Sequence, residues 1–107
     1  MTTFDKREDA FERKFAHDEE LKFKATARRN RLLGQWAAGL LGKSGPDVDA
    51  YVKEVIAADM EQAGEEDVFR KIRRDFDAAG VSQSDHQIRR AMAEMMQTAI
   101  LQIRDTA

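Results

Sequence analysis

Apolar side chains recur at intervals of three and four residues along most of this sequence, and glycines separate the periodic stretches. Such spacing places the apolar side chains on one face of an α-helix, where they can be buried together. Few residues are β-branched, which also favours helix over strand. Residues 19–41, 46–63 and 65–79 carry three of the stretches and residues 88–103 carry the fourth, and Trp36 is expected to anchor the helices. The pattern predicts an all-α fold, a four-helix domain.

Signals at the expected helix ends agree with this division. Pro46 suits a first helical turn, because proline lacks only an N–H that would be unpaired there. Gly64 and Gly80 stand just past two periodic stretches, where glycine commonly ends a helix. Either Ser82 or Ser84 caps the last helix, since both have roughly the spacing of a capping box.

The first residues follow another pattern. Phe4, Phe11 and Phe15 are spaced by seven and four residues, so a helix would place them within about 40° of one another. The step from Phe15 to Leu21 breaks this register, and Asp18 stands at the break as a candidate N-cap. Two interpretations follow. Either the segment extends the first helix and packs on the domain, or its phenylalanine face binds a groove in a partner.

The second interpretation is the expected one. Residues 1–18 hold three large aromatic side chains among many charged ones, too little apolar surface to fold alone. We therefore expect a mobile N-terminal arm over residues 1–18 and a four-helix globular domain over residues 19–107.

Charge is unevenly distributed. Residues 1–20 hold four Lys or Arg and seven Asp or Glu, a net charge of −3. Residues 21–31 hold five Lys or Arg and no acid, a net charge of +5. This basic stretch is either a solvated helix face or a docking patch for an acidic partner. The whole chain has a net charge of −2, which disfavours a nucleic-acid partner held by phosphate attraction.

Other classes of function lack the residues they need. The chain has no cysteine, which excludes disulfides, thiolate zinc sites and cysteine nucleophiles. His17 and His86 are isolated, and no catalytic set can be identified. We expect no enzyme activity, no catalytic residue, no metal and no cofactor. No apolar run approaches the roughly 20 residues of a membrane span, so we expect a cytoplasmic protein without direct membrane insertion.

One stretch, residues 37–44, nearly matches a phosphate-binding P-loop. Ala37 stands where the first glycine belongs, and an apolar helix rather than a strand precedes the stretch. Gly45 and Pro46 then interrupt the chain before the next helix. The interpretation is a helix C-cap followed by a turn.

Ten short stretches carry a resemblance to a known family. They are Thr3–Asp5, Arg7–Glu8, Ala10–Glu12, Lys14–Asp18, Phe23–Ala25, Ala27–Asn30, Leu32–Gly34, Trp36–Ala38, Leu40–Gly42 and Glu66–Lys71. Through them the chain resembles the zeta subunit of the F-type ATP synthase of alpha-proteobacteria. The resemblance spans nearly the whole chain and is tightest before residue 45.

The resemblance implies a four-helix protein whose N-terminal arm enters a catalytic α/β interface of the ATP synthase head, near the central stalk. There the arm blocks ATP hydrolysis, in the manner of the mitochondrial ATPase inhibitor protein. The implied partners are the α, β and γ subunits, and the implied location is cytoplasmic, peripheral to the inner membrane through the ATP synthase. An adenine-nucleotide-binding regulatory or sensor protein, with weak nucleotide binding, is the alternative.

The same resemblance, together with the phenylalanine face and the basic stretch, assigns the expected contacts. The expected partner-binding residues are Phe4, Arg7, Glu8, Phe11, Lys14, Phe15, Lys22, Arg28 and Arg29.

Overall fold

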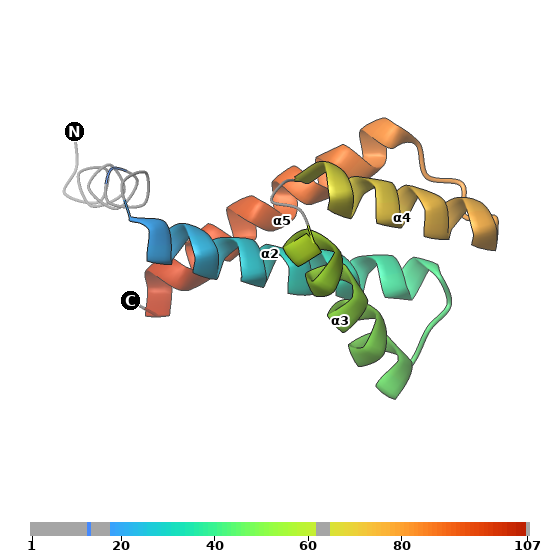
Figure 1. The fold of residues 1–107 in the computed structure, drawn as a ribbon, viewed down its shortest axis with the longest axis horizontal. Coiled ribbons are helices and arrows are strands. Elements are labelled where there is room, and N and C mark those ends of the chain that lie inside the picture. Colours follow the sequence, from blue (N-terminus) through green and yellow to red (C-terminus); the bar gives the residue numbers. More distant parts are fainter. Residues whose placement is uncertain (1–12, 14–17, 62–64, 107) are drawn as a thin grey trace.

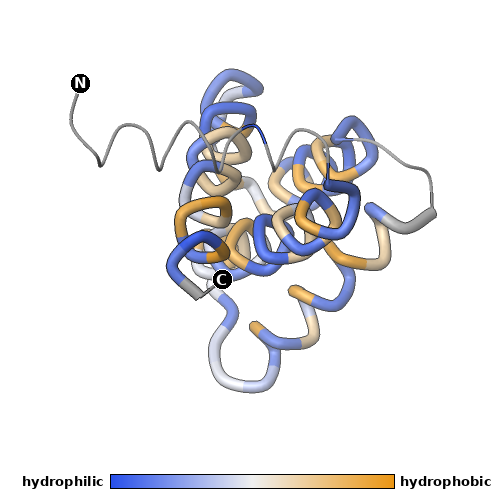
Figure 2. Tube along the Cα trace, turned by 90° about the vertical axis from the view of Figure 1, so that its left-hand side faces the viewer, coloured by the Kyte–Doolittle hydropathy of each residue, from blue (hydrophilic) through white to orange (hydrophobic). Residues whose placement is uncertain are grey.

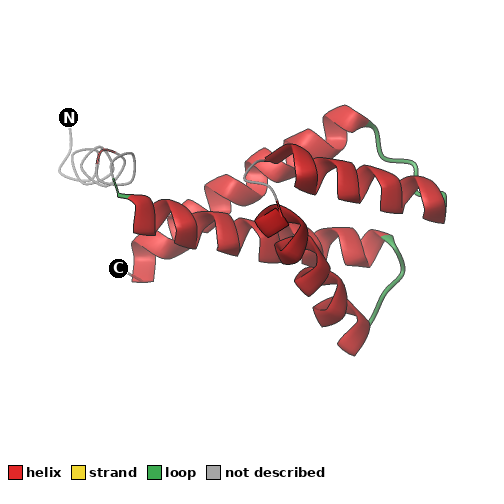
Figure 3. Cartoon of the chain, in the orientation of Figure 1, coloured by secondary structure: helices red, strands yellow, loops and turns green. Residues whose placement is uncertain are grey.

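The structure of the protein, a computed structural model, describes residues 13, 18–61 and 65–106. Over these residues it contains four helices and no strand, as Figure 3 shows. The helices are α2 (Glu19–Leu40), α3 (Pro46–Glu61), α4 (Glu65–Ala79) and α5 (Asp85–Thr106). The all-α, four-helix prediction is confirmed. The expected arm lies outside the described residues, apart from Arg13 and Asp18.

Asp18 is the N-cap of α2, as its position predicts. Its carboxylate accepts hydrogen bonds from the backbone N–H of Glu20 at 3.0 Å and of Leu21 at 3.2 Å. The two glutamates of the first turn, Glu19 and Glu20, stand where the helix dipole favours negative charge. The first turn of α2 is therefore specified by local sequence.

The stretch that resembles a P-loop is the C-terminal cap of α2. Gly42 has a φ of 78°, and its N–H donates to the carbonyl of Gly39 at 3.1 Å. The N–H of Lys43 donates to the carbonyl of Ala38 at 2.9 Å. Together these bonds form a Schellman motif, which ends a helix. The interpretation as a helix C-cap is confirmed.

A second cap decides between the two candidate serines before α5. The N–H of Ser84 donates to the side-chain oxygen of Gln87 at 2.8 Å, and the N–H of Gln87 donates to the hydroxyl of Ser84 at 3.1 Å. This reciprocal pair is a capping box, so Ser84 rather than Ser82 begins the helix.

Helix α2 is the centre of the arrangement. It packs against both α3 and α5, while α4 packs against α3 and α5. Helices α2 and α5 run antiparallel, so the start of α2 and the end of α5 lie side by side in Figure 1. In Figure 2 the hydrophobic positions of the helices turn toward one another and the hydrophilic positions turn outward. Most residues of the predicted apolar stripes lie on the faces that meet, although the predicted members Leu40 and Ala79 are exposed.

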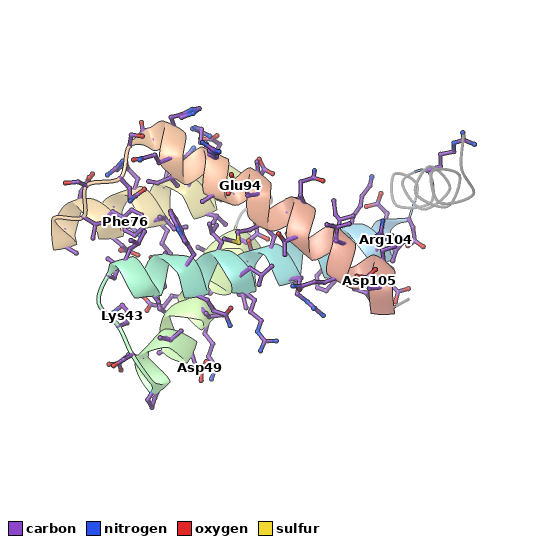
Figure 4. The ribbon with its side chains drawn as sticks, turned by 180° about the vertical axis from the view of Figure 1, so that it is seen from behind. Lys43, Asp49, Phe76, Glu94, Arg104 and Asp105 are labelled. Carbon is purple, nitrogen blue, oxygen red and sulfur yellow. The ribbon has the colours of Figure 1, made fainter. Side chains whose placement is uncertain are left out.

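The main core forms where all four helices meet. Trp36 is partly buried against this core, and its ring meets that of Phe76 edge-on, with centroids 5.7 Å apart. In Figure 4 Phe76 lies between α4 and α2. A smaller cluster closes the other end of the α2–α5 pair. It contains Leu21, Ala25 and Ile103, with Met96 and Ile100 packed against them.

A glycine brings α2 and α3 into close contact. A Cβ atom built on Gly34 would lie 3.0 Å from the Cα of Val52 and 3.1 Å from its Cγ2. The nearer atom belongs to the backbone, so a rotamer change cannot relieve the contact. The approach of the two helices therefore depends on the missing side chain at Gly34.

We expect Gly34→Ala to destabilise the protein by about 1–2 kcal/mol, measured by urea unfolding. The overlap with Val52 costs about 1–3 kcal/mol, and the better helix propensity of alanine recovers at most about 1 kcal/mol. Gly39→Ala is the matched control in the same helix, since nothing lies within 4 Å of its added Cβ. The control should stabilise by about 0.5–1 kcal/mol. Equal effects at the two glycines would contradict the close contact.

A buried tyrosine joins α3 to α4. The hydroxyl of Tyr51 donates to Asp75 at 2.8 Å, and the ammonium of Lys71 lies 3.0 Å from the same carboxylate oxygen. Burial first, then the hydrogen bond to Asp75 and the negative charges of Asp75 and Glu54, raise the pKa of Tyr51 far above its ordinary value. The folded state therefore keeps this phenol protonated in alkaline solution.

Alkaline pH should weaken the fold through this tyrosine. The folded-state pKa is raised, so its stabilisation is present below the unfolded pKa of about 10 and is lost as pH rises above it. From pH 8 to pH 11 the wild type should lose about 1.4 kcal/mol more than Tyr51→Phe. Urea midpoints measure this loss, and because the chain has one tyrosine, tyrosinate absorbance reports its ionisation. Ionisation without unfolding at pH 11 would contradict the prediction.

Candidate functional site

The basic stretch of residues 21–31 lies on α2, where helical periodicity distributes its five cations around the helix. The first two cations are exposed. Lys22 lies 3.6 Å from Glu19, and Lys24 lies 3.2 Å from Glu20. Ion pairs this exposed contribute little stability, so both ammonium groups can exchange these partners for others.

Arg29 differs from its neighbours, because its side chain is only 1% exposed. The guanidinium donates to Asn30 at 3.0 Å and to Glu65 at 3.2 Å, and it lies 3.8 Å from Asp59. These contacts join α2 to the end of α3 and the start of α4. The sequence analysis predicts Arg29 as a partner-binding residue, and the structure places its guanidinium inside the fold against these three side chains.

Arg28 and Arg31 face outward from the same helix. Arg28 donates to the side-chain oxygen of Gln102 on α5 at 3.0 Å, a neutral partner, and it forms no ion pair with a described carboxylate. Arg31 is exposed and forms no ion pair within the described part of the chain. These two charges are therefore directed to the outside.

A hollow of about 450 Å³ lies beside them, between α2, α3 and α5. We call it the basic groove. The basic groove is lined by Leu21, Phe23, Lys24, Ala27, Arg28, Arg31, Ile56 and Ile103. Half of these lining residues are apolar beyond alanine, and the charged ones among the described residues are all cationic. Phe23 is 73% exposed at this groove, although a phenyl ring is usually buried.

Sequence reasoning found the cations of this groove but not its apolar part. Phe23 falls off the predicted stripe of α2, and a single aromatic outside a stripe is a weak signal. Ile56 and Ile103 each read as ordinary members of an apolar stripe. The placement of α3 and α5 beside α2 brings them together with Phe23.

The described residues include a surface that a partner can contact, the basic groove. No group of three or more His, Cys, Asp or Glu side chains in the described ranges could hold a metal ion. None of the described helices combines the length and apolar character that crossing a bilayer requires. The expected arm contacts lie outside the described residues; they are Phe4, Arg7, Glu8, Phe11, Lys14 and Phe15.

Comparison with known families supplies the context for this surface. The family model of ATPase inhibitor subunit zeta matches residues 1–102 of the chain. The chain belongs to the ATPase inhibitor subunit zeta family. The resemblance found in the sequence is therefore confirmed, and it extends over both the expected arm and the helical domain.

A solved structure, described as "Solution NMR structure of the protein", is also similar to this zeta family member. It is 42% identical in sequence, with a TM-score of 0.71, and the match covers 81% of this chain and 99% of the other. No curated protein matches the chain. The solved structure supports the helical fold, and the family supports a regulatory role as an inhibitor.

Removing the buried cation should destabilise the fold. We expect Arg29→Met to cost about 2–3 kcal/mol in urea unfolding, because it keeps the aliphatic stem but leaves buried Asn30 without its partner. The cost stays below the roughly 3–5 kcal/mol of a fully buried broken pair, since the exposed carboxylate of Glu65 can return to water. Arg31→Met, on the exposed side of the same helix, should change stability by less than about 0.5 kcal/mol.

Proposed function

We propose that this protein inhibits the F-type ATP synthase by inserting its N-terminal segment, residues 1–18, into a catalytic α/β interface of the enzyme head. The observation that carries the proposal is the family match, which begins at residue 1 and so includes this segment. The proposed partners are the α, β and γ subunits. The proposed location is the cytoplasmic side of the inner membrane, through the ATP synthase.

The chemistry of the segment suits insertion between two subunits. On a helix, Phe4, Phe11 and Phe15 share one face, and each would contribute roughly 2 kcal/mol when buried. Ordering the segment opposes binding, so only part of this free energy appears as affinity. The charged side chains proposed to fix its register are Arg7, Glu8 and Lys14.

The helical domain would remain outside the interface. Lys22 and Arg28 lie close after the segment and carry outward charges that can contact the enzyme. Arg29 would support this contact only indirectly, by holding α2 against α3 and α4. The proposed protein is therefore a regulatory subunit with two parts, a segment that blocks catalysis and a domain that carries it.

A truncation tests the division of roles. Because Asp18 caps α2, the truncation removes residues 1–17 and keeps the cap. We expect the melting temperature to change by only a few degrees, since three large apolar side chains among many charged ones offer little surface to bury. Inhibition of ATP hydrolysis by the isolated enzyme head should be abolished. Undiminished inhibition would contradict the insertion mechanism.

Single substitutions test the phenylalanine face. Phe11→Ala and Phe15→Ala should each weaken inhibition by roughly 1–3 kcal/mol, as expected for aromatic interface anchors. Arg13→Ala is the control, because on a helix Arg13 lies on the side opposite the phenylalanines. Half-inhibitory concentrations measure the effect, and circular dichroism checks that each variant folds. Equal losses for all three variants would argue against an aromatic face.

A further inference from the structure

The basic groove exposes the aromatic ring of Phe23 beside other apolar side chains. Phe23 is 73% exposed, compared with 39% and 46% for the other exposed large apolar side chains among the described residues, Leu40 and Leu101. Apolar side chains of α2, α3 and α5 lie next to it in the same hollow. An exposed apolar surface with a charged rim is typical of a binding site.

The charges around this surface are of one sign. Three cations line the basic groove, Lys24, Arg28 and Arg31, and no carboxylate of the described residues lines it. Lys24 is paired only with exposed Glu20, Arg28 with a neutral amide, and Arg31 with no ionic partner in the described ranges. The groove therefore complements a surface that carries carboxylates.

The shape of the groove suits a helix. Phe23, Ala27 and Arg31 are four residues apart along α2, so they form one row on its surface. From Leu21 to Arg31 the helix rises about 15 Å, and Ile56 and Ile103 provide walls from α3 and α5. A groove of this length can hold about two to three turns of a second helix, whose apolar side chains would act as anchors.

We propose that the basic groove docks an acidic amphipathic helix of a protein partner and that, resting on the proposed function, this helix belongs to the ATP synthase head. Its apolar face packs on Phe23 and the isoleucines, and its carboxylates pair with Arg28 and Arg31. The groove is then an anchor separate from residues 1–18. It adds to the affinity of the protein for the enzyme, whereas the N-terminal segment contributes affinity and also stops the bound enzyme from hydrolysing ATP.

Binding and inhibition can be measured separately with the full chain. Fluorescently labelled variants are titrated with the isolated enzyme head for Kd, and residual ATPase activity is measured at saturation. Phe23→Ala and Arg31→Glu should each raise Kd at least tenfold while saturating protein still inhibits fully. The controls are Leu101→Ala, another exposed apolar side chain, and Arg74→Glu, another exposed arginine on α4. The controls should change Kd less than twofold.

Cross-linking identifies the occupant. The chain has no cysteine, so Ala27→Cys places a single benzophenone label in the groove. The label should react with a helix of an enzyme subunit that bears carboxylates beside apolar side chains. The same label at Ala93→Cys, an exposed position on α5, should not react there. High salt should weaken wild-type binding more than binding of Arg31→Glu.

Two results would overturn the groove proposal. One is an unchanged Kd for Phe23→Ala and Arg31→Glu. The other is a cross-link confined to residues 1–17 of the same chain, or protection of the label by ATP alone, which would assign a different occupant. Failure of the insertion mechanism would give a different result. The chain that lacks residues 1–17 would then still inhibit ATP hydrolysis, while the groove variants would still bind the enzyme head less tightly.

Discussion

The guanidinium group of Arg29 holds the corner where three helices meet. A charge with almost no contact with water is tolerated only when its hydrogen bonds are satisfied, and here Asn30, Asp59 and Glu65 accept or surround it. Two of these partners lie at the adjoining ends of α3 and α4. Together with the close contact at Gly34, Arg29 therefore helps to fix the position of α3 along α2, and with it the wall that Ile56 gives to the basic groove.

The same helix thus serves the inside and the outside of the molecule. Leu21, Ala25 and Arg29 recur every four residues and face inward. Phe23 and Arg31, eight residues apart, face outward. A run of five cations in the sequence is therefore two sets in space, one that stabilises the fold and one that can attract a partner. A run of charged residues in a sequence must therefore be divided into inward-facing and outward-facing side chains before a role is assigned to it.

Local features of the fold could be predicted from sequence, because each is decided by neighbouring residues. The cap at Asp18 and the C-cap at Gly42 use donors and acceptors within a few positions. The burial of Arg29 could not be predicted, since its charged partners stand 30 and 36 residues away, at Asp59 and Glu65. The exposure of Phe23 has a similar cause, because it depends on where α3 and α5 end beside α2.

The capping carboxylate of Asp18 also affects which changes in the sequence before α2 the fold can tolerate. Helix α2 starts at this residue through bonds to its own first turn, so the start does not require a particular chain before it. Insertions, deletions or wholesale exchange of the preceding segment need not alter the packing of the domain behind it. The four-helix domain is in this sense a carrier onto which different leading peptides could be grafted, by evolution or by design.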